Sequence, residues 1–360
     1  MEAYYWTIAV VFVLALMATK TNEQERLPPA DGGKRPILTK VLLALIIAIL
    51  IFVAGTRYFV GSDYVAYYHG ISLYGGGLID SLKTLDEPVL PLLATVLSWF
   101  TNDGAWFIFS CSLMTMLCAL LPVYKHTNDI LFATMLFIFA GIWHGSFNGV
   151  RQFLAAAIVF AGHRLIYDRK FLKYFLVVFL AFCVHRSAIV MILPYFILNN
   201  RISVKNIFLL ILGTLILSLN YDKIFEFVGF LKNEEMSIED QGYYSNTVNI
   251  LRVLVACAPA IFALVLRPFR GKDREKDFYI NALVINGVAM IATSNSAYLA
   301  RLGIYTNMFT PLAFVKNTEL ENKAIEKIVR AGIILLFSIY WYVEVSGSST
   351  LKQFHWIWER

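Results

Sequence analysis

Five arginines stand apart from the other basic residues because each has polar or aromatic neighbours beside an apolar stretch. They occur in "GTRYFVGSDY", "SFNGVRQF", "CVHRSA", "SNTVNILRV" and "NSAYLARLGIY", and they are Arg57, Arg151, Arg186, Arg252 and Arg301. A guanidinium group offers five N–H donors in a planar fork that matches phosphate oxygens, and it stays charged at any physiological pH. We therefore predict that the set binds an anionic, phosphate-bearing ligand. The alternative for each one alone is an arginine at a helix end that extends to the membrane interface.

The stretch "GTRYFVGSDYVAYYHG" adds a carboxylate and several polar rings to Arg57. Tyr64, Tyr67 and Tyr68 follow Asp63 at a spacing that puts them on one helix face. Such rings suit a sugar, whose C–H faces pack on aromatics while its hydroxyls bond to polar groups. Asp63 could accept a proton from an attacking hydroxyl. The alternatives are a salt bridge from Asp63 to one of the arginines and an ordinary interfacial belt of tyrosines.

His185 is the second candidate proton acceptor, because the pKa of an imidazole is naturally near neutral. The alternative is a histidine at a helix end that hydrogen-bonds only to the backbone. Most other acids on the same side of the membrane, Glu87 among them, occur in loop sequence that is typical of solvent-exposed surface.

The elements that must position these residues are membrane helices. Of the 360 residues, 58% are hydrophobic and 16% charged, whereas a soluble domain has about a quarter charged residues. Mean hydropathy is +0.63. Apolar runs cover the whole length, so we predict one integral membrane domain over residues 1–360. The net charge of +6 fits loops that face an anionic leaflet, and no nucleic acid is needed to explain it. The cysteines lie in apolar runs without metal-ligand spacing and are expected to be packing residues.

A membrane helix needs about 20 mostly apolar residues. The candidate spans are 3–19, 38–56, 104–123, 130–147, 152–168, 204–220, 247–266, 278–296, 301–315 and 326–345. Residues 88–101 are short and contain prolines, and residues 171–198 form either one long span or two short ones broken at "HRS".

Charge decides between these topologies, because cytoplasmic loops collect Lys and Arg. Most of the 31 basic residues fall on one side if the N-terminus is outside, 88–101 does not cross, and the chain turns back at 185–187. We therefore predict an all-α polytopic bundle with about twelve crossings. Both termini are then outside, and a long first external segment, 56–103, carries an amphipathic or re-entrant helix.

The motifs resemble those of the EpsG family, bacterial polysaccharide polymerases similar in role to the Wzy polymerases. The matching segments are "GTRYFVGSDYVAYYHG", "NGVRQFLAAAIVFAG", "HRSAIVMILPYFIL" and "LARLGIYTNMF", in the family's order. The resemblance covers nearly the whole chain, and the first two segments are specific as a pair. The family also resembles the GT-C membrane glycosyltransferases, in which an acidic residue of the first external loop often serves the reaction.

The resemblance implies transfer of a growing glycan from undecaprenyl pyrophosphate onto a lipid-linked repeat unit, at the outer face of the bacterial cytoplasmic membrane. It also suggests a chain-length regulator and a flippase of the same pathway as protein partners. Arg57, Arg151, Arg186 and Arg301 would bind the pyrophosphate, and Asp63 or His185 would activate the acceptor hydroxyl. Tyr64, Tyr67, Gln152 and Tyr305 would contact sugars.

No nucleotide cofactor is expected, because the donor is linked to a lipid and no glycine-rich phosphate loop is visible. Dependence on a divalent metal stays open, since one aspartate makes a poor site unless the pyrophosphate supplies other oxygens. Two further functions remain. A ligase that moves a finished glycan to another acceptor would use the same pyrophosphate chemistry, and a flippase would need a polar path across the whole bilayer.

Overall fold

The computed structural model describes residues 1–24, 35–74, 87–200, 212, 247–267 and 273–360. These residues are almost wholly helical, and their one sheet is an antiparallel pair, β1 (Arg57–Tyr58) and β2 (His355–Trp356). The prediction of an all-α bundle is therefore confirmed for the described part of the chain.

Among the described residues, four helices are long and apolar enough to cross a membrane by length and composition. They are α1 (Glu2–Gln24), α2 (Ile37–Gly55), α7 (Gly104–His126) and α22 (Lys323–Gly347). They correspond to the expected spans 3–19, 38–56, 104–123 and 326–345.

The remaining helices are shorter except α18, which has 19 residues like α2, and several expected spans are built from two pieces. The pieces are α8 (Ile130–Phe139), α9 (Ile142–Gly145), α10 (Val150–Ala161), α11 (His163–Tyr167), α12 (Phe171–Phe182), η2 (Arg186–Met191), α13 (Ile192–Leu198), α17 (Ile250–Leu266), α18 (Arg274–Ala292), α19 (Ala297–Ala300), α20 (Gly303–Asn307) and α21 (Thr310–Asn317). The expected span 130–147, for example, is interrupted at Gly141, whose φ of 85° ends α8. The expected span 204–220 lies outside the described residues. The count of about twelve crossings and the GT-C architecture stay predictions.

Residues 171–198 form two short antiparallel elements, as the charge argument requires. Helix α12 ends at Phe182, and η2 begins at Arg186. The Tyr174 hydroxyl donates to the Met191 carbonyl at 2.7 Å, and the rings of Phe171 and Tyr195 lie 5.0 Å apart. The chain therefore turns back at Val184–His185.

The segment after α2 does not continue into the membrane as one helix. It forms β1, α3 (Tyr64–Tyr68) and α4 (Gly70–Tyr74), and α6 (Val89–Ser98) follows later in the chain. Helix α6 has 10 residues and is about 15 Å long, half the thickness of a hydrocarbon core. The expectation that 88–101 does not cross stays a prediction, because α8 lies in an expected crossing and also has 10 residues.

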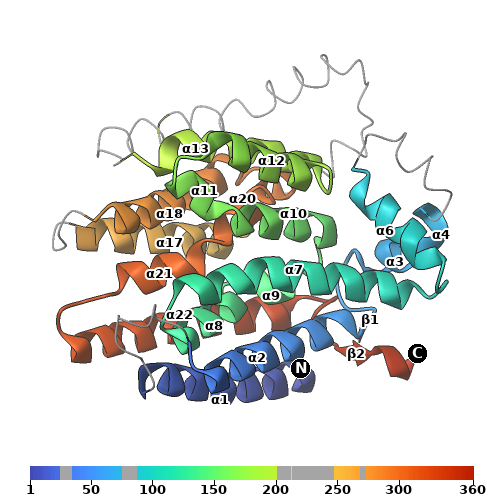
Figure 1. The fold of residues 1–360 in the computed structure, drawn as a ribbon, viewed down its shortest axis with the longest axis horizontal. Coiled ribbons are helices and arrows are strands. Elements are labelled where there is room, and N and C mark those ends of the chain that lie inside the picture. Colours follow the sequence, from blue (N-terminus) through green and yellow to red (C-terminus); the bar gives the residue numbers. More distant parts are fainter. Residues whose placement is uncertain (25–34, 75–86, 201–211, 213–246, 268–272) are drawn as a thin grey trace.

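These short elements gather at one end of the bundle, which we call the β1 end (Figure 1). It holds β1, β2, α3, α4, α6 and both chain termini, and the Met1 ammonium group donates to the Lys352 carbonyl at 3.2 Å. The Ile357 N–H bonds to the Thr56 carbonyl, and Arg360 pairs with Asp103 at 2.7 Å. The C-terminal segment thereby joins the end of α2 to the start of α7.

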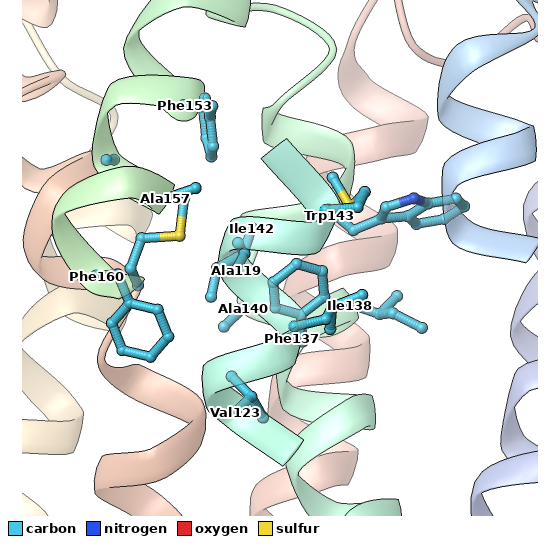
Figure 2. Close-up of a cluster of buried hydrophobic side chains, with 14 of the residues drawn as sticks. Ala119, Val123, Phe137, Ile138, Ala140, Ile142, Trp143, Phe153, Ala157 and Phe160 are labelled. Atoms are coloured by element: carbon cyan, nitrogen blue, oxygen red, sulfur yellow. The ribbon is translucent and has the colours of Figure 1, made fainter. Parts of the chain in front are cut away.

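A buried apolar cluster fixes the position of α10 relative to α7 and α8 (Figure 2). Its large side chains include Phe137, Trp143, Phe153 and Phe160, all less than 9% exposed. The Trp143 indole N–H also donates to the Leu50 carbonyl of α2 at 3.3 Å. Helix α10, whose first turn carries Arg151 and Gln152, packs against α7, α12 and α20.

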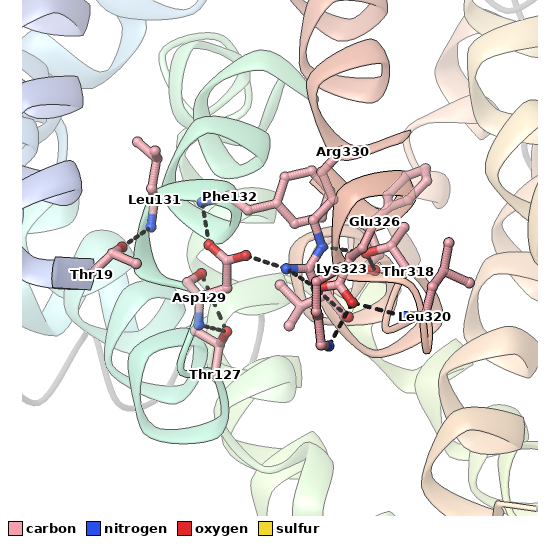
Figure 3. Close-up of polar contacts among 12 residues, drawn as sticks. Thr19, Thr127, Asp129, Leu131, Phe132, Thr318, Leu320, Lys323, Glu326 and Arg330 are labelled. Carbon is pink, nitrogen blue, oxygen red and sulfur yellow. Dashed lines mark hydrogen bonds and ion pairs between the residues drawn. The ribbon is translucent and has the colours of Figure 1, made fainter. Parts of the chain in front are cut away.

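The opposite end of the bundle is held by an ion network between α8 and α22 (Figure 3). Arg330 pairs with Asp129 at 2.5 Å and with Glu326 at 2.8 Å. Asp129 also caps α8 by accepting the Phe132 N–H at 3.0 Å. One guanidinium therefore ties the start of α8 to α22.

Gly104→Ala is expected to destabilise the β1 end. A Cβ at this position would lie 1.6 Å from the Tyr68 carbonyl oxygen, so the backbone of α3 or α7 would have to move. Gly332→Ala in α22 is the matched control, because a Cβ there meets nothing within 4 Å. We expect a lower thermal unfolding midpoint in detergent for Gly104→Ala and an equal or higher one for Gly332→Ala. Equal midpoints for the two variants would contradict the close contact.

Arg330→Met is expected to cost roughly 2 kcal/mol of stability, between the values for a surface pair and a buried pair. It removes the ion-pair partner of Asp129 and leaves Glu326 with Lys323 alone. The exposed Lys327, three residues earlier on α22, provides the control Lys327→Met. Denaturant unfolding of both purified variants in detergent checks this. A loss no larger than that of the control would show that the network adds no stability.

Candidate functional site

Residues from five separate segments meet at the β1 end. We call them the Glu87 cluster: Tyr67 of α3, Glu87 before α6, Arg151 and Gln152 of α10, His185 and Ser187 at the turn after α12, and Tyr305 of α20. Five of these seven were candidates from sequence.

Glu87 is the residue that joins the cluster. One carboxylate oxygen pairs with Nη1 of Arg151 at 2.6 Å, and the other accepts the backbone N–H of Arg186 at 3.0 Å. That second oxygen also lies 3.7 Å from Nδ1 of His185. Glu87 has a φ of 59°, a left-handed conformation that is uncommon outside glycine and is found at functional sites.

Arg151 is held in one orientation and remains accessible. Its Nε donates to the Tyr67 hydroxyl at 3.0 Å while Nη1 donates to Glu87. Two bonds to different nitrogens fix the plane of the guanidinium group. The side chain is 40% exposed, so a ligand can reach it without rearrangement.

His185 is fixed as a neutral ring. Its Nδ1 accepts the Ser187 N–H at 3.2 Å and lies 3.0 Å from the Ser187 hydroxyl. Because Nδ1 accepts an N–H, we assign the ring proton to Nε2. Burial lowers the pKa of His185, the charge of Glu87 opposes this, and Arg151 and Arg301 lower it further. The neutral imidazole can donate a hydrogen bond through Nε2.

Ser187 connects the histidine to two sugar-contact candidates. Its hydroxyl lies 2.9 Å from the Tyr305 hydroxyl and accepts from Nε2 of Gln152 at 3.3 Å. Gln152 also donates to the Arg301 carbonyl at 3.1 Å. The polar atoms of Gln152 and Tyr305 are thus oriented by internal bonds.

Arg57 lies apart from the cluster and is 1% exposed. It donates to the carbonyls of Ala54 and Val60 and to the Ser112 hydroxyl, and its guanidinium lies 4.8 Å from the centre of the Phe147 ring. Burial lowers the pKa of Arg57 to about 10, so it is still charged at neutral pH. The structure places it as a brace between α2 and α7, out of reach of a ligand in this conformation.

The tyrosines after Asp63 point in two directions. Tyr64 is 1% exposed and stacks on Tyr68 with ring centres 5.7 Å apart, whereas Tyr67 reaches Arg151. Tyr64 packs against Arg57 and Tyr67 against Arg151. The tyrosines therefore do not form the exposed sugar-binding face that their spacing predicted.

Asp63 borders the cluster without an ion pair among the described residues. It is partly exposed and accepts from the Ser62 hydroxyl at 2.9 Å. The pKa of Tyr67 is raised mainly by burial, and the charge of Asp63 adds to this. The salt bridge to Arg57 that the sequence left open is not formed, because Arg57 is bonded to carbonyls.

The other three predicted arginines differ from one another in their surroundings. Arg186 is exposed and follows His185, and Arg301 adds its charge to the surroundings of His185. Arg252 instead forms a two-pronged pair with Glu344 of α22, at 2.9 and 2.7 Å. The structure brings Arg151, Arg186 and Arg301 together around Glu87 and His185 and keeps Arg57 apart, whereas Arg252 lines the same cavity as Arg301.

Glu87 and Ser187 are the residues that sequence reasoning missed. The sequence analysis counted Glu87 among solvent-exposed loop acids, but its side chain is 15% exposed. Only the proline that follows it and the apolar residues of α6 distinguish its sequence from that of the other loop acids. The described residues contain no group of three or more His, Cys, Asp or Glu side chains that could hold a metal ion.

Glu87→Gln is expected to move the pKa of His185 further below its ordinary value of 6.5. The carboxylate is the group that stabilises the imidazolium against burial and the arginines, and the amide lacks its charge. A pH titration of the histidine ring signals by NMR measures this, with the His185 signal assigned from a His185→Gln variant. Glu321→Gln, at an exposed residue of the opposite end, should leave the His185 pKa unchanged. An upward shift in Glu87→Gln would contradict the arrangement.

Comparison with known proteins agrees with the motifs. Searches of curated proteins and of solved structures gave no significant match. A model of the EpsG family matches residues 40–357, a region that contains most of α2, the whole Glu87 cluster and β2. The chain therefore belongs to the EpsG family.

Proposed function

We propose that this protein is a polysaccharide polymerase that transfers a growing glycan from undecaprenyl pyrophosphate onto a lipid-linked repeat unit. Family membership supports polysaccharide polymerisation in general. The observation that carries the proposal is the Glu87 cluster, in which Arg151 is held in a fixed orientation with Arg186 and Arg301 nearby. Such an array fits a pyrophosphate group at the end of a membrane bundle.

The charge distribution supports a site on the outer face of the bacterial cytoplasmic membrane. The loop after α11 carries Arg169 and Lys170, and the start of α22 carries Lys323 and Lys327, all at the end opposite β1 (Figure 1). Basic loops mark the cytoplasmic side. The β1 end, with both termini and the Glu87 cluster, then faces outward, as expected for about twelve crossings.

The reaction forms a bond between the acceptor hydroxyl oxygen and the anomeric carbon of the donor glycan. It breaks the bond from that carbon to the pyrophosphate oxygen. The lipid pyrophosphate leaves with the electron pair, and the hydroxyl proton passes to a base. Negative charge therefore grows on the leaving pyrophosphate, and preorganised cations lower the barrier most when they face that charge.

The cluster residues divide these tasks. Arg151, Arg186 and Arg301 bind the pyrophosphate, and the Nε2–H of His185 donates to one of its oxygens. Glu87 is a positioning residue, because its carboxylate holds Arg151 and the Arg186 N–H. Gln152 and Tyr305 are buried and act as positioning residues that hold Ser187 beside His185. Arg252, which lines the same cavity as Arg301, contacts the glycan, and Asp63 is the base that receives the hydroxyl proton.

The test is incubation of the purified protein in detergent with lipid-linked repeat units and no nucleotide sugar, with products read as a ladder on a gel. A ladder supports the polymerase. A single product with an added acceptor glycan supports a ligase instead. Movement of the lipid-linked unit across vesicle membranes without new bonds supports a flippase. Both of these outcomes would overturn the proposal.

Arg151→Lys should lower the polymerisation rate about a hundredfold, because lysine keeps the charge but cannot make the paired bonds of the fork. Arg169→Lys, at an exposed arginine of the opposite end, is the matched control and should keep the wild-type rate. The initial rate of ladder formation at equal protein concentration measures both. Wild-type activity in Arg151→Lys would remove Arg151 from the site.

Asp63→Asn tests the role of the base without changing the arginines that bind the pyrophosphate. Loss of the carboxylate should abolish turnover while the variant still binds undecaprenyl pyrophosphate as tightly as the wild type. Glu2→Gln, at an exposed acid of the same end, should not change turnover. Full turnover in Asp63→Asn would transfer the role of base to another group.

A further inference from the structure

A polar cavity lies beside the Glu87 cluster. Its volume is about 310 Å³, which is within the size range of ligand pockets. Its walls come from the α9–α10 loop, α17, α18, α20 and α22. Arg301 belongs to both places, because it lines the cavity while its carbonyl accepts from Gln152 of the cluster.

The cavity presents hydrogen-bond donors whose orientation is fixed. The side-chain oxygen of Asn148 accepts the Ser62 N–H at 2.9 Å, so its amide N–H groups are the part that remains to donate. The side-chain oxygen of Asn286 likewise accepts from the Thr306 hydroxyl at 2.8 Å. Both residues line the cavity. Donors that are held in place before binding recognise oxygen-rich ligands at little entropic cost.

The place of the cavity indicates which substrate it holds. Ser62 lines it, and the Ser62 hydroxyl donates to Asp63, the base proposed above. The base must lie next to the acceptor hydroxyl, whereas the pyrophosphate belongs to the donor. The acceptor side of the reaction therefore coincides with the cavity.

We propose that this cavity binds a sugar ring of the acceptor glycan, with Asn148 and Asn286 as its hydrogen-bonding residues. This inference rests on the proposed function and assigns its second substrate. The cavity then selects which acceptor sugar reacts, and this selection is separate from pyrophosphate binding.

The probe is the repeat-unit oligosaccharide released from its lipid pyrophosphate by mild acid. It lacks the group that Arg151 recognises and keeps the sugar. Binding to the full-length protein in detergent is measured by calorimetry, and inhibition of the polymerisation ladder is measured in parallel. The wild type should bind the oligosaccharide, and the oligosaccharide should slow polymerisation.

Two variants test the cavity in different ways. Asn286→Leu removes the amide donor at nearly constant volume, and Ala256→Leu fills part of the cavity from α17. Each should weaken oligosaccharide binding about tenfold or more, the value of one lost hydrogen bond or a partly blocked site. Asn317→Leu is the control, a buried asparagine of α21 that does not line the cavity. Arg151→Met should bind the free oligosaccharide normally.

The outcomes separate the two proposals. Unchanged binding in both Asn286→Leu and Ala256→Leu overturns the cavity assignment, and so does absence of binding by a wild-type protein that makes a ladder. A wild type that binds the oligosaccharide through the cavity but makes no ladder supports the sugar site and overturns the polymerase. Weaker binding in Asn317→Leu than in the cavity variants would also contradict the assignment.

Discussion

The arrangement of the β1 end depends on one buried guanidinium group. Arg57 bonds to the carbonyls at the end of α2, to the turn at Val60 and to Ser112 of α7, and it lies against the Phe147 ring. A buried charge without these partners would be very costly. Because they come from four parts of the chain, the charge is satisfied only when all four have assembled. Asp63, Tyr67 and the loop before Arg151 then acquire fixed positions.

The sequence predicts those parts of the fold that follow from composition and charge. The four long helices and the break at His185 follow from apolar length and the side on which basic residues gather. Motif resemblance predicted the family. The interruption at Gly141 was not predicted, because a single glycine inside an apolar run is tolerated in many membrane helices.

The site was only partly predictable, since residue type does not reveal which partner a side chain finds. Arg57 and Arg151 have similar sequence surroundings, yet one is enclosed by carbonyls and the other is held at the surface by Glu87 and Tyr67. Glu87 resembled a loop acid because its role depends on Arg151 and on the turn after α12, each far away in sequence. Long-range pairing of this kind has no local signal.

The pairing of β1 with β2 sets an order on assembly. Residues 355 and 356 follow the last membrane helix, and they close the turn that precedes Asp63 by pairing with Arg57 and Tyr58. During synthesis this turn stays unpaired until α22 has been inserted and its following segment has reached the β1 end. A partly made chain therefore lacks the strand that closes the turn before Asp63, and this turn becomes paired only after residues 355 and 356 have been synthesised.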